Sequence, residues 1–324
     1  MTRPRSSHYP LEVAMCDVVQ RCLDGGARQV DLAVEFAGAR SWIRVAADVS
    51  CLRVAAPYDD EEESPIAAPA GPAGLDVVSA CLWHGAAVSV AGEDASGERH
   101  VVRWERRGHT AIGRTLGAGG PPGAQPDDLS RDLGRAVVLL DDLDEVLAYK
   151  RREGRVIETA ITRMRGRIGD ALGLAFHRLL GEAPRRRAPI AVSINAKPVE
   201  PRDPFAGGAG SHRLHRRELP FVVEGRVETV VATPHVLDAV DDDPVADRQG
   251  FFAYLRDRLV QAGGWSRLTV EDRSDAIARI AVDVPPSALD SFVWEPAPRR
   301  LLFPAALAPA MRAVAFEAVS AAGR

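Results

Sequence analysis

Two arginine-rich runs in the second half of the chain hold the side chains best suited to contact phosphate or metal. One is the run 185–187, and the other, residues 212–217, combines three arginines with His212 and His215. Arginine forks bind phosphate oxygens, so either run could contact a nucleic acid or another phosphorylated ligand. Exposed arginine loops are commoner than binding sites, and the two histidines lack the nearby cysteine or carboxylate partners of a metal centre. A nucleic-acid partner therefore remains an alternative.

The other reactive side chains point to structural roles. Cys16, Cys22, Cys51 and Cys81 lie in apolar contexts and form no paired metal motif, which predicts buried free thiols in a reducing compartment. His177 lies on a helix with an apolar stripe, where we expect it to be hydrogen-bonded within its domain rather than catalytic. No Ser-His-Asp arrangement stands out.

Length and composition are those of a soluble protein with two domains. The chain has 324 residues, which is long for one hydrophobic core. Its 46% hydrophobic and 27% charged residues are ordinary, and a net charge of −4 gives no general case for nucleic-acid binding. No apolar run approaches the length of a membrane span, so we expect a cytoplasmic protein with no membrane partner.

The elements that must position any site begin with an amphipathic helix over residues 11–24. Its apolar residues recur at three- and four-residue steps, and Gly25 and Gly26 end it. Residues 29–36 and 42–47 alternate between apolar and polar side chains, which predicts a β-hairpin that packs on the helix. Similar patterns predict helices over 75–83 and 156–180, and strands over 87–91, 100–104, 135–140, 222–234 and 278–285.

The order of these elements and their local sequence resemble the nucleotide-binding domain of the GHKL superfamily, which includes gyrase B, Hsp90, MutL and MORC. The family pattern Glu-x-x-Asp-Asn-x-x-Asp-Ala-Gly-Ala lies over residues 17–27 without a gap. Segments 172–180, 193–205, 249–265 and 278–285 are similar to bacterial MutL/MORC-like proteins. The resemblance implies an α/β (α+β) fold, with a Bergerat-fold ATPase-like domain over residues 1–148 and a ribosomal-S5-like transducer domain over residues 149–324.

The helix pattern implies a nucleotide-binding set with altered chemistry. Active relatives use its first carboxylate to activate the water that attacks the γ-phosphate, and here Asp17 is shorter by about one methylene. The asparagine that holds Mg²⁺ corresponds to Arg21, a fixed cation that would repel the metal. Gln20 and Asp24 occupy the remaining two positions and complete this vestigial set.

The motif that reads adenine in the family is also altered. Its aspartate corresponds to Ala47, which precedes Asp48, and its two glycines correspond to Val49 and Cys51. The resemblance therefore implies that base recognition and the close approach of the backbone to a nucleotide are both impaired.

The glycine-rich phosphate lid of the family corresponds to residues 71–79. Gly71, Gly74 and Ser79 remain, whereas Asp76 replaces a glycine and Val78 replaces the lysine. An acidic side chain has the wrong charge for a position that cradles phosphate.

The resemblance also implies a lysine from the second domain that reaches the γ-phosphate, soon after residues 290–292. That segment contains no lysine, and Arg299 or Arg300 is the nearest substitute. We therefore expect a pseudo-ATPase without ATP or Mg²⁺ as cofactor, which serves as a non-catalytic scaffold or regulatory subunit. Its expected partner is a protein, either a second copy in a homodimer or an active GHKL protein.

The alternative is a divergent ATPase. It would use Asp17 as general base, Asp48 to recruit adenine or metal, and Arg299 or Arg300 in place of the lysine. Bacterial relatives of this kind often act in DNA handling or defence.

Overall fold

A computed structural model of the chain describes residues 9–37, 40–52, 63–67, 71–72, 74–93, 96–116, 135–143, 148–149, 154–181, 189–238, 245, 248–268, 270, 277–296 and 299–323. The arginine run 185–187 lies outside these residues. The chain forms two compact units, one of residues 1–69, 74–172 and 182–200, and one of residues 70–73, 173–181 and 201–324. Helices and large mixed sheets occur together, which confirms the α/β (α+β) fold class.

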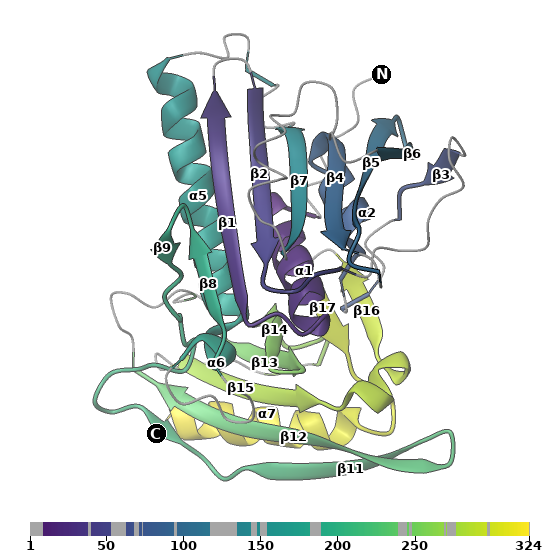
Figure 1. Cartoon of the computed structure of the whole chain (residues 1–324). Helices are drawn as coiled ribbons and strands as arrows, with labels where there is room; N and C mark the ends of the chain where they lie inside the picture. The colour runs from purple at the N-terminus through teal and green to yellow at the C-terminus, as the bar shows by residue number, and fades with distance from the viewer. Residues whose placement is uncertain are drawn as a thin grey trace. The chain divides into compact units, whose positions relative to one another are not determined.

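The first unit is built on a nine-stranded mixed sheet (Figure 1). Its strands lie in the order β3-β6-β5-β4-β7-β2-β1-β8-β9, and the β1–β8 pair is parallel. The bounds are β1 (Gln29–Ala37), β2 (Arg40–Ala47), β3 (Glu63–Pro65), β4 (Gly85–Glu93), β5 (Arg99–Arg107), β6 (Thr110–Leu116), β7 (Ala136–Leu143), β8 (Ala191–Ile194) and β9 (Lys197–Pro198).

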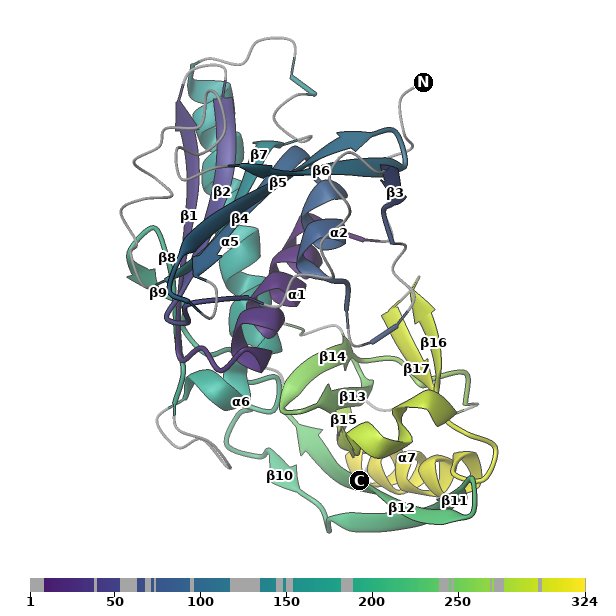
Figure 2. The same ribbon diagram turned by 45° about the vertical axis from the view of Figure 1, so that its right-hand side comes forward.

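Helices of the first unit lie on one face of this sheet, as Figure 2 shows. They are α1 (Leu11–Asp24), α2 (Val77–Leu82) and α5 (Arg155–Ala175), whose last three residues belong to the second unit. Val30, Leu32 and Val34 of β1 are buried, and Asp31 between them belongs to the opposite face of the sheet. The alternation over residues 29–36 therefore predicted the strand and its buried face.

The second unit has a six-stranded sheet in the order β10-β12-β15-β13-β14, with β11 also paired to β12. Helix α7 packs on one face through Met311, Val314 and Ala315. The bounds are α6 (His177–Leu180), β10 (His212–Arg213), β11 (Arg217–Val223), β12 (Arg226–Leu237), β13 (Gly250–Leu255), β14 (Arg258–Ala262), β15 (Ile277–Val284), the 3-10 helix η1 (Pro286–Ser291), the hairpin β16 (Val293–Pro296) and β17 (Arg299–Leu302), and α7 (Ala308–Ala322).

Three features differ from the sequence-based expectations. The first unit extends past the expected boundary at residue 148, because β8 pairs with β1 and joins the first sheet. The helix expected over 156–180 breaks at Phe176, which has φ −114° and ψ 14°. The strand expected over 222–234 is a hairpin, because Glu224 and Gly225 have the positive φ values of a tight turn, 48° and 78°. Among the described residues, no helix is long and apolar enough to span a membrane.

Asp31 connects three strands on the face of the sheet away from the helices. Its carboxylate accepts hydrogen bonds from Ser193 Oγ at 2.7 Å and from Arg135 Nη2 at 2.8 Å. Gln29 Nε2 donates to the same carboxylate at 3.0 Å. Burial raises the pKa of the Asp31 carboxyl, but the bonds from Ser193 and Arg135 outweigh burial and hold this pKa below its ordinary value.

We expect this lowered pKa to make the first unit sensitive to acid. The ionised carboxylate stabilises the fold fully above the unfolded pKa of about 3.9, and this contribution is lost as the pH falls through the lower folded value. The unfolding free energy of wild type should decrease as the pH falls from about 6 to 2, and this decrease should be smaller in Asp31→Asn. Chemical denaturation at each pH measures it. Asp290→Asn, at an exposed carboxylate, is the control. Identical pH profiles for wild type and Asp31→Asn would contradict the prediction.

Candidate functional site

Asp17, the candidate general base, is buried in α1 with 1% of its surface exposed. The Tyr9 hydroxyl donates to its Oδ2 at 2.7 Å, and the backbone N–H of Leu75 donates to the same oxygen at 3.1 Å. Gly74 lies against this carboxylate with φ +81°, and a Cβ there would be 2.3 Å from Asp17 Oδ1. The carboxylate therefore anchors two distant backbone segments to the helix.

Sequence reasoning missed both of these partners. Tyr9 lies 8 residues before Asp17 and Leu75 lies 58 residues after it. A lone tyrosine and a backbone amide carry no local sequence signal. The one available signal was Gly74, since a glycine with positive φ can mark a place where the backbone approaches another group closely.

Arg21, the residue at the expected metal position, also contacts the segment that bonds to Asp17. Its guanidinium lies 3.3 Å (Nε) from the carbonyl oxygen of Leu75 and 3.5 Å (Nη2) from that of Gly74. Asp24 Oδ2 lies 3.8 Å from its Nη1, and Gln20 donates to Asp24 Oδ1 at 3.0 Å. The four helix positions of the predicted set thus lie together, and a cation stands where a metal ion would need oxygen ligands.

The expected adenine-reading position offers no polar group. Ala47 is fully buried and pairs with Val30 in the sheet. Asp48, the next residue, accepts hydrogen bonds at its Oδ1 from the backbone N–H groups of Arg28 and Gln29, at 2.8 and 2.9 Å. Its carboxylate caps the start of β1 and has a structural role there.

The residues that match the phosphate lid also have structural partners. Asp76 is the N-cap of α2 and accepts from the backbone N–H of Ser79 at 2.9 Å. The Ser79 hydroxyl accepts from the backbone N–H of Ala67 at 3.1 Å. Gly71 belongs to the short segment 70–73, which is grouped with the second unit. The acidic residue that would repel phosphate is thus a helix cap.

Arg299 and Arg300, the candidate substitutes for the lysine, lie on β17 of the second unit. The Arg299 guanidinium carbon lies 5.3 Å from the centre of the Trp294 ring. Arg300 Nε lies 3.7 Å from Glu295 Oε2, and Arg267 also pairs with Glu295. Both candidate arginines contact neighbours within their own unit.

The side chains around Asp17 do not fit a nucleotide bound with Mg²⁺. Magnesium requires near-octahedral oxygen ligands, and the helix offers the cation of Arg21 beside a carboxylate that already accepts two hydrogen bonds. Within the described ranges, no group of three or more His, Cys, Asp or Glu side chains could hold a metal ion. What the arrangement does chemically is hold the backbone of residues 74–75 against α1.

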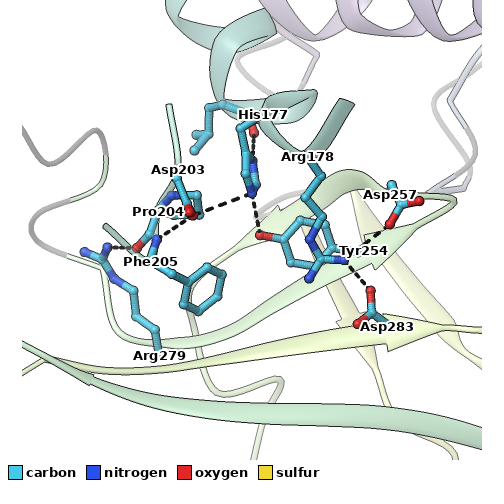
Figure 3. Close-up of polar contacts among 10 residues, drawn as sticks. His177, Arg178, Asp203, Pro204, Phe205, Tyr254, Asp257, Arg279 and Asp283 are labelled. Carbon is cyan, nitrogen blue, oxygen red and sulfur yellow. Dashed lines mark hydrogen bonds and ion pairs between the residues drawn. The ribbon is translucent and has the colours of Figure 1, made fainter. Parts of the chain in front are cut away.

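A second polar cluster lies on the sheet of the second unit, where Figure 3 shows His177 beside Tyr254 and Asp203. His177 Nδ1 lies 2.8 Å from the carbonyl oxygen of Leu174, and a carbonyl can only accept, so Nδ1 carries a proton. In the neutral ring Nε2 then accepts from the Tyr254 hydroxyl at 3.2 Å, and Asp203 Oδ1 lies 3.7 Å away. His177 is hydrogen-bonded within its unit, as the sequence predicted.

Arg178 holds the same cluster together from the other side of Tyr254. Its guanidinium carbon lies 3.3 Å from the centre of the Tyr254 ring, and it pairs with Asp283 and, at 3.6 Å, with Asp257 (Figure 3). Only 10% of the Arg178 side chain is exposed. Arg178 therefore connects α6 to β13 by stacking on Tyr254 and to β15 by its ion pair with Asp283.

Arg279 connects β15 to two other backbone segments of the second unit, one at Pro204 and one over residues 245–248. It is fully buried and donates to the backbone carbonyls of Arg248 at 2.9 Å, Val245 at 2.7 Å and Pro204. Gly250 at the start of β13 has φ +105°, and a Cβ there would be 2.5 Å from the Gly264 carbonyl oxygen. The matching motifs of this unit are explained by packing and by satisfaction of the backbone.

The histidine- and arginine-rich run 212–217 is exposed, and two of its arginines are already paired. Arg216 contacts Glu218 at 3.1 Å, and Arg217 donates to both oxygens of Glu317 at 2.9 and 3.0 Å. His212 Nδ1 lies 3.2 Å from the carbonyl oxygen of Gly210. Acidic neighbours thus offset part of the positive charge that the sequence suggested for nucleic acid.

The prediction of four buried thiols is correct for three cysteines and wrong for one. Cys16, Cys22 and Cys81 are buried, but Cys51 is exposed because it lies just beyond the end of β2. Burial, reinforced by the charge of Asp48, raises the pKa of Cys22 to about 12, although a backbone hydrogen bond opposes it. Burial also raises the pKa of Cys81, so both thiols stay protonated at neutral pH.

Comparison with known proteins gives only distant structural likenesses to report, without a match in sequence. No protein-family model and no curated protein sequence matches the chain. Its structure is similar to the crystal structure of the N-terminal domain of a DNA repair protein, with 11% sequence identity and a TM-score of 0.45, over 97% of this chain and 98% of the other. A likeness at this level assigns neither a family nor an activity.

Removal of the Tyr254 hydroxyl should loosen the second cluster. Tyr254→Phe keeps the ring under Arg178 but leaves His177 Nε2 without its donor, which should cost about 1 kcal/mol of unfolding free energy. Denaturant unfolding would measure the loss. Tyr149→Phe is the matched control, because Tyr149 is 41% exposed. An equal effect of both substitutions would contradict the role given to the hydroxyl.

The native protein should show one rapidly reacting thiol. An aromatic disulfide reagent needs an accessible thiolate, so Cys51 should react first and the other three cysteines only after unfolding. Absorbance after reagent addition, in buffer and in denaturant, measures both sets. Cys51→Ser should abolish the rapid phase, and its persistence would show that a buried thiol is accessible.

Proposed function

We propose that the first unit is a Bergerat-type nucleotide-binding domain whose site has become a structural anchor, and that the chain acts as a non-catalytic scaffold or regulatory subunit. In this proposal it neither binds Mg²⁺ nor turns over ATP, and it acts by pairing with another protein chain. The observation that carries the proposal is the buried Asp17 carboxylate, bonded to Tyr9 and Leu75.

The geometry of Asp17 argues against a role as general base. A general base must reach the attacking water within hydrogen-bond distance in a defined pose, and displacements of about 1 Å can cost a hundredfold in rate. Asp17 is 1% exposed, and Gly74 lies directly against its Oδ1. Water could reach the carboxylate only if residues 74–75 moved away, which would break the Leu75 bond and leave a buried charge less satisfied.

Arg21, at the position expected to hold the metal ion, also argues against ATP hydrolysis. Hydrolysis of the γ-phosphate relies on charge neutralisation by a metal ion held in the right place. Arg21 directs its guanidinium at the carbonyls of Gly74 and Leu75. An arginine can neutralise phosphate charge, but it cannot orient water or bridge two phosphates as a hydrated Mg²⁺ does.

The alternative function is a divergent ATPase in which the segment over Asp17 opens before nucleotide binds. One observation favours it: the segment that covers Asp17 contains Gly74, and glycine is the residue whose backbone changes conformation most readily. In that case Asp17 would be exposed by movement of residues 74–75, with Asp48 and Arg299 or Arg300 as further candidates.

Calorimetric titration of ATP and ADP, with and without Mg²⁺, tests the proposal. We expect no saturable heat up to about 1 mM nucleotide, which corresponds to binding weaker than about −4 kcal/mol. Asp17→Asn should leave this result unchanged but lower the unfolding free energy by about 1–3 kcal/mol, since it removes a buried charged acceptor. Glu158→Gln, at an exposed carboxylate on α5 of the same unit, is the control and should change neither quantity much.

Phosphate release distinguishes the two functions. Micromolar Mg²⁺-dependent binding, together with phosphate release that Asp17→Asn abolishes and Glu158→Gln spares, would overturn the proposal and establish the ATPase alternative. A stability loss in Asp17→Asn without any phosphate release by the wild type would support the structural anchor.

A further inference from the structure

Helix α7 is apolar on nearly its whole circumference, although the described residues of the second unit pack on only one face of it. Met311, Val314, Ala315 and Ala318 are buried against the sheet. Arg312 and Glu317 are the only charged residues among the 15 of the helix. A helix that is apolar all round is normally buried all round, so the outward face of α7 is unlike that of a solvent-facing helix.

The outward face is centred on Phe316, which is 71% exposed. The turn before it carries Ala313, and the turn after it carries Ser320, at the three- and four-residue steps that place side chains along one stripe. In heptad terms Ala313 and Phe316 occupy positions a and d, and the buried residues of α7 occupy b, c and f. The stripe is therefore opposite the face that packs on the sheet.

The two charged residues, Arg312 and Glu317, lie on either side of this stripe. Their opposite charges favour an identical helix as the partner. Arg312 falls at position g and Glu317 at position e of the following heptad. In a parallel pair of identical helices, position g of one chain lies beside position e of the next heptad of the other, and such pairs set partner choice and orientation. A two-fold axis along the helices would bring Arg312 beside Glu317 of the second copy twice.

We propose that the outward face of α7 is a docking surface for α7 of a second copy of this chain, in parallel orientation. Phe316 packs across the two-fold axis against its own copy, and the small side chain of Ala313 lets the helices approach closely. Glu317 already accepts from Arg217. A carboxylate has about four acceptor sites, so it can also receive Arg312 of the second copy.

The contact spans about two heptads, so its area lies at the low end for specific interfaces and its affinity should be modest. The proposal rests on α7 alone and does not depend on the proposed loss of nucleotide chemistry in the first unit. Its failure would leave that proposal untouched, because the nucleotide titrations do not involve α7.

Sedimentation equilibrium of the full chain over about 5–300 μM tests the association. We expect a monomer–dimer equilibrium that Phe316→Glu weakens by at least about tenfold. Val293→Glu is the matched control, because Val293 is 61% exposed on β16 of the same unit. A monomer at every concentration, or equal effects of the two substitutions, would overturn the proposal.

Charge exchange tests the partner and its orientation. Arg312→Glu alone and Glu317→Arg alone each place like charges together in a homodimer, and both should weaken it. Mixing the two variants restores both opposite-charge pairs, so a heterodimer at near wild-type affinity is expected. Failure of the mixture to associate better than either variant alone would overturn the proposed register.

A cysteine cross-link provides a separate check on direction. Ser320→Cys in a Cys51→Ser background places a thiol at position a, where a parallel pair brings it opposite its own copy. Mild oxidation should then give a disulfide-linked dimer, whereas the Cys51→Ser parent should stay monomeric in denaturing electrophoresis. An antiparallel pair would separate the two thiols, so absence of the cross-link from associated protein would overturn the parallel arrangement.

Discussion

A buried carboxylate needs hydrogen-bond donors. In the first unit this requirement holds three parts of the chain together: helix α1, the segment before it and the segment before α2. Asp17 lies inside the apolar face of α1, where an unpaired charge would cost several kcal/mol. Tyr9 and the amide of Leu75 supply its hydrogen bonds, so the segment before α1 and the segment before α2 are both held to the helix. Gly74 follows from the same constraint, since a side chain there would collide with the carboxylate.

The same geometry explains what the sequence could and could not predict. Helix 11–24 and the hairpin after it were predicted because their signal is local: apolar periodicity and a Gly-Gly stop. The break at Phe176 was missed because the apolar stripe of the helix continues past it. The turn at Glu224 was missed because residues typical of strands lie on both sides of it. The partners of Asp17 are distant in sequence, and no periodicity reports a contact between a helix and a remote backbone amide.

Resemblance in sequence can reflect packing as easily as chemistry. In the second unit Arg279 is fully buried, and its guanidinium donates to three backbone carbonyls from two separate segments, those of Val245 and Arg248 and that of Pro204. Gly250 and Gly264 allow two backbones to touch, which a side chain at Gly250 would prevent. Such positions restrict residue type as strictly as a catalytic site does, although they perform no reaction. Sequence patterns in this unit can therefore be explained by packing and backbone hydrogen bonds, without a reaction.

Substitutions at buried, hydrogen-bonded positions and at partly exposed positions differ in how much unfolding free energy they cost. At Arg279 or Asp17, truncation would leave buried donors or acceptors without partners, and the fold would lose stability directly. A partly exposed position such as Arg21 can hold many side chains at little cost, because solvent satisfies whatever the protein does not. A substitution at Arg21 should therefore cost less unfolding free energy than one at Asp17, whose carboxylate accepts hydrogen bonds from Tyr9 and from the backbone of Leu75.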